Sequence, residues 1–160
     1  MEDKAITFMK EALKLAEKAK EADEVPIGAV IVYNDEIIGR GYNQRNSQKN
    51  PLAHAEIQAI EEAAKYIGDW RLEGCSIYVT LEPCPMCAGA IVQARIDKII
   101  FGTRNPKAGC GGSILNILNE PRFNHQVEII EGICQEECSQ ILKTFFTQMR
   151  NKRLKMEVDI

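Results

Sequence analysis

Apolar residues recur at helical spacing along the first part of the chain. They return every three or four positions, at Ile6, Met9, Leu13 and Ala16. This pattern predicts an amphipathic helix over residues 3–22. Pro26 follows and prevents the helix from continuing, because proline lacks the amide proton that the next turn needs. The chain therefore begins with a helix that buries one face.

Short β-branched runs separated by turn residues come next. Residues 28–33 are small and β-branched, the pair at 34–35 is Asn-Asp, and residues 37–42 resume an extended pattern. Together they predict a β-hairpin. Similar runs predict three more strands, over residues 76–80, 98–102 and 126–131.

Helical patterns lie between and after these strands. They are expected over residues 54–66, over a stretch that begins at Pro85 and ends at residue 94, and over residues 134–155. Proline is favoured in the first turn of a helix, which supports the start at Pro85. Residues 43–52 form a polar loop, and glycines at 109, 111 and 112 mark another. Strands that alternate with helices predict a layered α/β fold, and the opening hairpin makes its sheet mixed rather than all parallel.

Length and composition are those of one globular domain, which we expect to span residues 1–160. The chain has 160 residues, 45% of them hydrophobic and 27% charged, values that exclude a disordered or fibrous protein. No apolar run approaches the roughly 18 residues that a membrane span needs. The N-terminus is charged and has no apolar signal core, so we expect a cytoplasmic protein with no membrane partner.

The charge of the chain is slightly acidic, with a formal net value of −3. This excludes a protein that coats nucleic acid by bulk electrostatics, but it allows a small basic patch. Basic residues gather in the last helix, at Lys143, Arg150, Lys152, Arg153 and Lys155. This cluster is either a solvated helix face or a local binding surface.

Two short motifs carry the candidate chemistry. The first is His54-Ala55-Glu56, and the second is a C-x-x-C pair formed by Cys84 and Cys87. Each begins where a helix is expected to start, and the unpaired amides and positive dipole there favour a thiolate, the form that binds metal. For His54 and Glu56 to share a pocket, His54 must lie at or before the first turn, since residues two apart do not meet on a regular helix.

A C-x-x-C pair by itself is also typical of redox sites and of structural zinc sites. A redox pair needs no His-x-Glu partner, and a structural zinc is normally closed by four protein ligands. One histidine and two cysteines leave a position open, which favours a catalytic zinc with Glu56 free to move protons. The sequence spacing does not mark any of the other cysteines, at 75, 110, 134 and 138, as a fourth metal ligand. They are expected to be reduced thiols.

Longer stretches around these motifs resemble a known family. They include residues 25–30 (VPIGAV), 41–43 (GYN), 53–56 (AHAE) and 78–90 (YVTLEPCPMCAGA), and later residues 101–102, 107–109, 112–113, 124–125 and 145–146. Over nearly its whole length the chain resembles the zinc-dependent deaminases of the cytidine/deoxycytidylate deaminase superfamily, and within them the bacterial tRNA adenosine deaminase family. The residues after the cysteines carry the narrower resemblance.

The resemblance implies a three-layer α/β/α fold around a five-stranded mixed sheet, a homodimer, and one Zn²⁺ per subunit. His54, Cys84 and Cys87 would hold the metal. Glu56 would take a proton from an activated water and pass it to the base. The substrate would be the anticodon stem-loop of an arginine tRNA, whose wobble adenosine is flipped into the pocket and converted to inosine.

The same resemblance points to candidate RNA contacts. Asn43 matches a position that hydrogen-bonds the purine, although the sequence alone favours a turn residue at the end of a strand. Pro26 and Ile27 match pocket-lining positions, although packing at the entry to the strand explains both equally well. Phe145 and Phe146 match a pair on the last helix near the RNA, of which at least one is expected to be core. At Asn105 the family often has Asp, so we predict that Asn105 contacts RNA and loosens the choice between ribose and deoxyribose.

Two other functions use the same motifs. A deaminase of free guanine or cytosine would share the zinc site and differ in the pocket walls. A binding protein with a structural zinc would carry no catalysis, and its function would survive the loss of Glu56. The remaining histidine, His125, precedes a strand and is expected to make a structural hydrogen bond.

Overall fold

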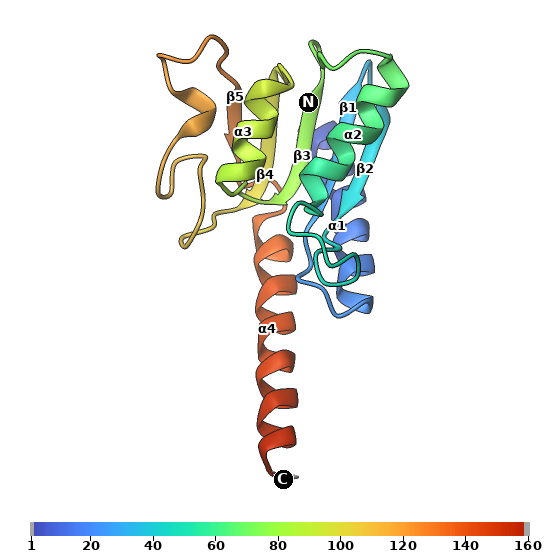
Figure 1. Cartoon of the computed structure of the whole chain (residues 1–160), viewed down its shortest axis with the longest axis vertical. Helices are drawn as coiled ribbons and strands as arrows, with labels where there is room; N and C mark the ends of the chain where they lie inside the picture. The colour runs from blue at the N-terminus through green and yellow to red at the C-terminus, as the bar shows by residue number, and fades with distance from the viewer. Residues whose placement is uncertain (1, 159–160) are drawn as a thin grey trace.

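Five strands form one mixed sheet in the computed structural model, which describes residues 2–158 (Figure 1). The strands are β1 (Gly28–Tyr33), β2 (Glu36–Tyr42), β3 (Ser76–Leu81), β4 (Lys98–Thr103) and β5 (Glu128–Glu131). Their order across the sheet is β2-β1-β3-β4-β5. β1 runs antiparallel to β2 and β3, whereas β3, β4 and β5 are parallel. The five-stranded mixed sheet predicted from the sequence is confirmed.

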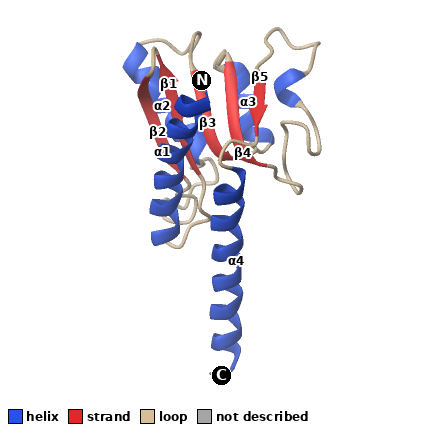
Figure 2. Cartoon of the chain, turned by 180° about the vertical axis from the view of Figure 1, so that it is seen from behind, coloured by secondary structure: helices blue, strands red, loops and turns tan. Residues whose placement is uncertain are grey.

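Helices cover both faces of this sheet. They are α1 (Glu2–Glu21), α2 (Ala55–Ile67), α3 (Pro85–Gln93) and α4 (Gln135–Val158). Helices α2 and α3 lie in front of the sheet in Figure 1, and α1 and the start of α4 lie in front of it in the reverse view of Figure 2. The three-layer α/β/α arrangement is therefore confirmed. The rest of α4 extends well beyond the end of the sheet in both views.

The central strands bury both of their faces. In β3, Ile77 and Val79 join the core under α2 and α3, whereas Tyr78 joins the core under α1 and α4. The same alternation occurs in β1 and β4. This follows from the two-residue period of a strand, and it explains why these segments read as continuous apolar runs.

A close contact between β2 and α2 fixes the position of that helix. A Cβ atom placed on Gly41 would lie 2.1 Å from the carbonyl oxygen of Ala55, the first residue of α2. Only glycine allows the backbones to approach so closely. This contact sets the first turn of α2 against the sheet, directly after His54 and around Glu56.

The last strand is shorter than predicted. It was expected over residues 126–131, but residues 126 and 127 pair with the segment before them. The amide of Val127 donates to the carbonyl of Leu118 at 2.9 Å, next to a short 3₁₀ turn (Ile117–Asn119) that the sequence did not suggest. The last helix continues to Val158, three residues beyond its predicted end, and the other elements match their predicted bounds to within one residue.

No helix within residues 2–158 is both long enough and apolar enough to cross a membrane.

Candidate active site

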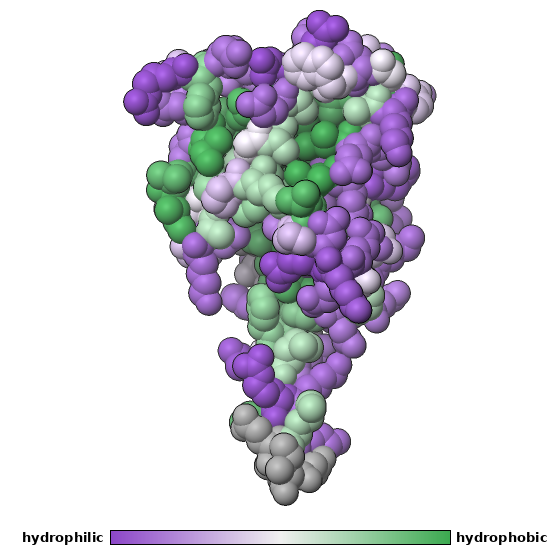
Figure 3. Space-filling view, in the orientation of Figure 1, coloured by the Kyte–Doolittle hydropathy of each residue, from purple (hydrophilic) through white to green (hydrophobic). Residues whose placement is uncertain are grey.

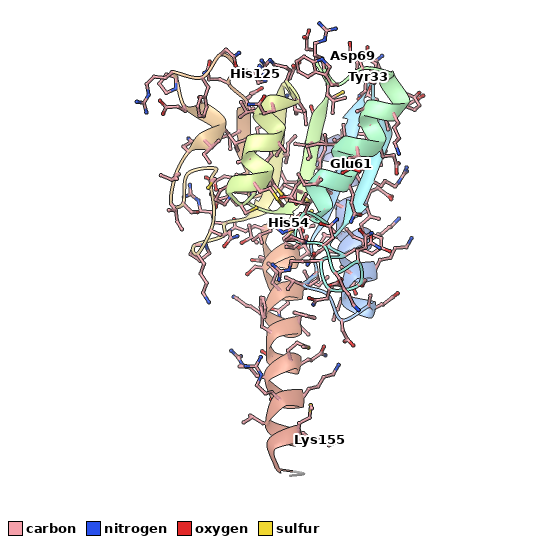
Figure 4. The ribbon with its side chains drawn as sticks, in the orientation of Figure 1. Tyr33, His54, Glu61, Asp69, His125 and Lys155 are labelled. Atoms are coloured by element: carbon pink, nitrogen blue, oxygen red, sulfur yellow. The ribbon has the colours of Figure 1, made fainter. Side chains whose placement is uncertain are left out.

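The two motifs meet at the end of the sheet where α2 and α3 begin. The Sγ atom of Cys84 lies 3.7 Å from Nδ1 of His54, and the Sγ atom of Cys87 lies 3.5 Å from the same nitrogen. All three ligand atoms lie within 4.8 Å of one another. Figure 4 shows His54 at the junction of α2, α3 and the beginning of α4. We call this group, together with Glu56, the ligand corner.

Helix geometry explains why these side chains converge. His54 and Cys84 are the N-cap residues of α2 and α3, and both have an extended backbone. Neither side chain makes the capping hydrogen bond that an N-cap side chain often makes, so the imidazole and the thiol can point toward each other. The position of His54 just before the first turn is the one required for it to share a pocket with Glu56. Both helix dipoles present their positive ends to the corner, which favours thiolate.

The separations fit a tetrahedral zinc ion. Zn–S bonds of about 2.3 Å and Zn–N bonds of about 2.0 Å place a sulfur and a nitrogen ligand roughly 3.5 Å apart. The two measured S···N distances are close to this value. Two sulfurs and one imidazole nitrogen are also the donor set that zinc prefers.

The charges of the corner depend on one another. The pKa of Cys84 falls to about 4, first because the Cys87 thiol donates a hydrogen bond to it and then because His54 does so. The same hydrogen bond raises the pKa of Cys87, because that thiol must keep its proton. The pKa of His54 is raised, mainly by its hydrogen bond with Cys84. The hydrogen bonds among the three side chains thus favour a thiolate at Cys84, which is the form that binds metal.

Glu56 lies in the first turn of α2 and is 4% exposed. Burial raises the pKa of its carboxyl group to about 7. A carboxyl group with a pKa near neutrality can both accept and donate a proton near neutral pH. Glu56 therefore has the position and the protonation equilibrium of a general acid and base.

A cavity of about 840 Å³ opens onto the corner. His54, Glu56 and Cys84 form part of its wall. The rest of the wall comes from the two ends of the β1–β2 hairpin, the end of β3, the loop after β4, and the inner face of α4. The hairpin ends contribute Val25, Ile27, Asn43 and Arg45, and the end of β3 contributes Leu81 and Glu82. On α4 this face consists of Ser139, Leu142, Lys143, Phe146, Thr147 and Arg150, and we call it the α4 face.

Comparison with known proteins places this geometry in a family. The family model of the MafB19-like deaminases matches residues 2–150. A tRNA-specific adenosine deaminase from Bacillus subtilis is 54% identical over 146 residues, 91% of each chain. One from Haemophilus influenzae is 45% identical over 147 residues, which is 91% of this chain and 85% of the relative.

The chain belongs to the tRNA-specific adenosine deaminase family. A structure solved in a study of A-to-I editing by tRNA:A34 deaminases at the wobble position of transfer RNA superimposes with a TM-score of 0.82 at 41% identity. It covers 85% of this chain and 99% of that one. A guanine deaminase from Nitrosomonas europaea, at a TM-score of 0.75 and 20% identity, shares the fold.

Of the residues that the sequence predicted to contact the base, Asn43 and Ile27 line the cavity. Asn43 is buried and engaged within the protein: its Nδ2 donates to the carbonyl of Val25 and its Oδ1 accepts from the amide of Arg45, both at 3.2 Å. It therefore shapes the loop that follows it. Pro26 is buried and does not belong to the cavity wall.

The two phenylalanines of α4 point in different directions. Phe146 is 47% exposed and lines the cavity, whereas Phe145 is buried on the side that faces α1. Of the basic residues in the last helix, Lys143 and Arg150 lie on the α4 face. Lys152 lies elsewhere on the helix and forms an ion pair with Asp23 at 3.2 Å.

Asn105 lies in the loop after β4 and lines the cavity. Its Oδ1 accepts hydrogen bonds from the amides of Lys107 and Ala108, at 3.3 and 3.2 Å. This turn geometry needs only a side-chain oxygen, which Asp would also supply. The position therefore combines a structural role in the loop with a place in the wall.

Sequence reasoning missed several residues of this region. Arg45 and Arg104 line the cavity from loops, outside the stretches that resemble the family. Lys107 also lines it and lies in the stretch 107–109, but no contact was predicted for it. Two buried carboxylates, Glu24 and Glu82, were also missed, and each holds a loop beside the cavity. The one sequence signal for these two carboxylates was their position, since Glu82 directly follows an apolar strand and Glu24 lies just after the first helix.

The remaining cysteines are set apart from the corner. Cys75, Cys110 and Cys138 are buried, and burial raises the pKa of Cys75 to about 11 and that of Cys138 to about 12. They are therefore neutral thiols. Nε2 of His125 lies 2.7 Å from the carbonyl oxygen of Ile96, so the predicted structural hydrogen bond is confirmed. Within residues 2–158, the one group arranged to hold a metal consists of His54, Cys84 and Cys87.

Proposed function

We propose that this tRNA adenosine deaminase acts hydrolytically on the wobble adenosine of an arginine tRNA, in the cytoplasm, and converts it to inosine. The observation that carries the proposal is the composition of the ligand corner. His54, Cys84 and Cys87 offer three zinc ligands, and a buried carboxyl group that is not among them lines the same cavity.

Zinc suits this donor set, and we propose one ion per subunit. When bound, it would supply an activated water at neutral pH. Three protein ligands leave one position for that water, which distinguishes the site from a structural zinc site with four protein ligands.

Glu56 would carry the protons of the reaction. It takes one proton from the attacking water and delivers it to N1 of the purine as oxygen adds to C6. It then takes the remaining proton from the hydroxyl group at C6 and donates it to the amino group, so that the C6–N bond breaks, ammonia leaves and the carbonyl group of inosine forms. A pKa of about 7 suits a group that must act in both directions.

The wall of the cavity supports a nucleic acid rather than a free base as substrate. Its volume of about 840 Å³ exceeds that of one nucleobase, and the cationic side chains Arg45, Lys107 and Arg150 line it. Such cations contact phosphates, and an exposed aromatic ring such as Phe146 can stack on an unpaired base. The anticodon stem-loop presents both features. Deamination of free guanine or cytosine, the alternative, explains neither the cations nor the exposed ring.

We also propose that the chain acts as a homodimer. Figure 3 shows a continuous green, apolar surface over α3 in the centre of the view. The segment just before the short 3₁₀ turn (Ile117–Asn119), which packs against α3, adds the side chains of Ile114 and Leu115, which are 53% and 57% exposed. Large apolar patches on soluble proteins usually mark contacts with partners. Sedimentation of the zinc-loaded protein at the mass of two chains would support the dimer, and a monomer at micromolar concentration would contradict it.

A panel of substrates tests the activity. Ammonia release is measured with an arginine-tRNA anticodon hairpin, the same hairpin with guanosine at the wobble position, free adenosine, guanine and cytosine. We expect release from the adenosine-containing hairpin alone, with inosine at the wobble position. Turnover of guanine or cytosine without turnover of the hairpin would overturn the proposal.

The role of Asn105 in choosing between RNA and DNA has its own test. Because Asn105→Asp keeps the oxygen that accepts from Lys107 and Ala108, the loop should be preserved while a negative charge is added to the cavity wall. We expect the variant to favour an RNA hairpin over the matching DNA hairpin more strongly than the wild type does. An unchanged ratio of the two rates would contradict this role.

A further inference from the structure

A buried carboxylate without a cationic partner follows β3. Glu82 is 1% exposed, and no lysine, arginine or histidine in the described part of the chain forms an ion pair with it. Its oxygens instead accept four hydrogen bonds. The donors are the amides of Asn105 at 3.0 Å, Gly111 at 2.8 Å and Ser113 at 3.0 Å, and the hydroxyl group of Ser113.

All four donors belong to one segment, residues 104–113, which we call the 104–113 loop. Asn105, Pro106, Lys107 and Ala108 of this loop form one wall of the cavity. The loop is also tied to itself, because the amide of Gly109 donates to the carbonyl of Asn105 at 2.8 Å. Glu82 therefore lies at the centre of the structure that holds this wall.

The contact between the carboxylate and the loop leaves no spare room. A Cβ atom on Gly109 would lie 2.4 Å from Cδ of Glu82 and 2.5 Å from the carbonyl oxygen of Asn105. The amide of Cys110 donates to the carbonyl of Pro83 at 2.9 Å, one residue before Cys84. The loop is thus joined to the segment that carries the metal ligands, both through Glu82 and through its neighbour Pro83.

We propose that Glu82 is a positioning residue, which fixes the 104–113 loop relative to Cys84 so that the RNA-facing wall and the reacting centre keep one geometry. The substrate in this statement rests on the proposed function. A carboxylate suits the role because both of its oxygens only accept hydrogen bonds. Glutamine would turn an amino group toward two of the donors, and those donors would lose their partner in a buried place.

The variant Glu82→Gln tests the proposal, with Glu24→Gln as the matched control. Glu24 is equally buried but accepts from Asn46 and Ser47, in the loop on the other side of the cavity. Both variants and the wild type are loaded with zinc. Amide hydrogen exchange, zinc content, and KM and kcat on the hairpin are then measured.

In Glu82→Gln we expect faster exchange at the amides of Asn105, Gly111 and Ser113, full zinc content, and a KM raised roughly tenfold or more with a smaller loss of kcat. In Glu24→Gln the faster exchange should move to Asn46 and Ser47. Gly109→Ala, which pushes the loop off the carboxylate without changing charge, should reproduce the Glu82→Gln pattern. The milder Ser113→Ala, which removes a single hydrogen bond, should shift exchange and KM in the same direction if Glu82→Gln does not fold.

Unchanged exchange in the loop, or an unchanged KM, would overturn the proposal. So would loss of zinc or a loss confined to kcat, since Glu82 would then act on the ligand corner and not on the wall. If the wild type does not deaminate the hairpin, the proposed function fails. The exchange data and zinc content would still decide whether Glu82 positions the loop.

Discussion

The ligand corner and the α4 face border the same cavity, yet they differ in how far their side chains are exposed to solvent. In the corner, Glu56 and Cys87 are buried, and the burial and hydrogen bonds there shift pKa values strongly. On the α4 face, Lys143, Phe146 and Arg150 are exposed to solvent. The corner is suited to metal binding and proton transfer, whereas the α4 face is suited to binding a large charged ligand. Chemistry and recognition are therefore separable by mutation.

The largest effect is expected at Glu56. Glu56→Gln removes the proton carrier and keeps the shape of the side chain, so we predict a fall in kcat of roughly 10²–10⁴-fold. Zinc content and hairpin affinity should stay near those of the wild type. Glu61→Gln, on the exposed side of the same helix, is the control and should leave kcat unchanged (Figure 4). Normal turnover by the Glu56 variant would contradict the role assigned to it.

Removal of a metal ligand should come next. Because a third ligand is needed to hold the ion, Cys87→Ser is predicted to lower zinc content well below one per chain and to abolish activity with it. Cys138→Ser changes an equally buried cysteine that packs in the core under α1 and α4, outside the metal-ligand group, and should keep its zinc. Zinc can be measured by atomic absorption. Full zinc content in the Cys87 variant would show that this thiol is not a ligand.

The corner was largely predictable from the sequence. Spacing alone placed Cys84 and Cys87 on one turn, and the starts of α2 and α3 were expected where their motifs lie. The cavity wall was not predictable in the same way. Arg45 and Lys107 reach it through loops whose paths depend on buried carboxylates such as Glu82, and no short-range pattern records that interaction. The sequence could not show which of Phe145 and Phe146 is buried and which lines the cavity, since their orientation depends on how α4 packs against α1.

The α4 face should affect binding more than chemistry. A chain that ends after Phe146 lacks Arg150, Lys152, Arg153 and Lys155. We expect weaker hairpin binding and a shallower dependence of affinity on salt, by about 0.7 in the logarithmic slope for each phosphate of single-stranded RNA that the shortened chain no longer binds. Zinc content should be unchanged. Arg122→Ala, which removes an exposed arginine paired with Glu120, serves as the control. Equal affinity of the shortened and full chains would remove the part of α4 beyond Phe146, which includes Arg150 of the α4 face, from RNA recognition.

The smallest effect concerns the pH dependence of stability. Burial raises the pKa of Glu24, but hydrogen bonds from Ser47 and Asn46 outweigh it and leave the pKa below its ordinary value of 4.5. Its stabilising contribution is therefore complete above that value and is lost as the pH falls through the lower pKa of the folded state. Glu24→Gln should unfold more easily in urea at pH 7, and its stability should fall less than that of the wild type on acidification. An identical acid dependence in both proteins would contradict this account.

The central claim is that the ligand corner adds water to the wobble adenosine. The most direct test is to incubate the zinc-loaded protein with the arginine-tRNA hairpin in water enriched in oxygen-18, and then to weigh the wobble nucleoside by mass spectrometry. Hydrolysis at C6 predicts inosine that carries one oxygen-18 atom, formed together with one ammonia. Unchanged adenosine, or inosine without the heavy oxygen, would contradict the claim.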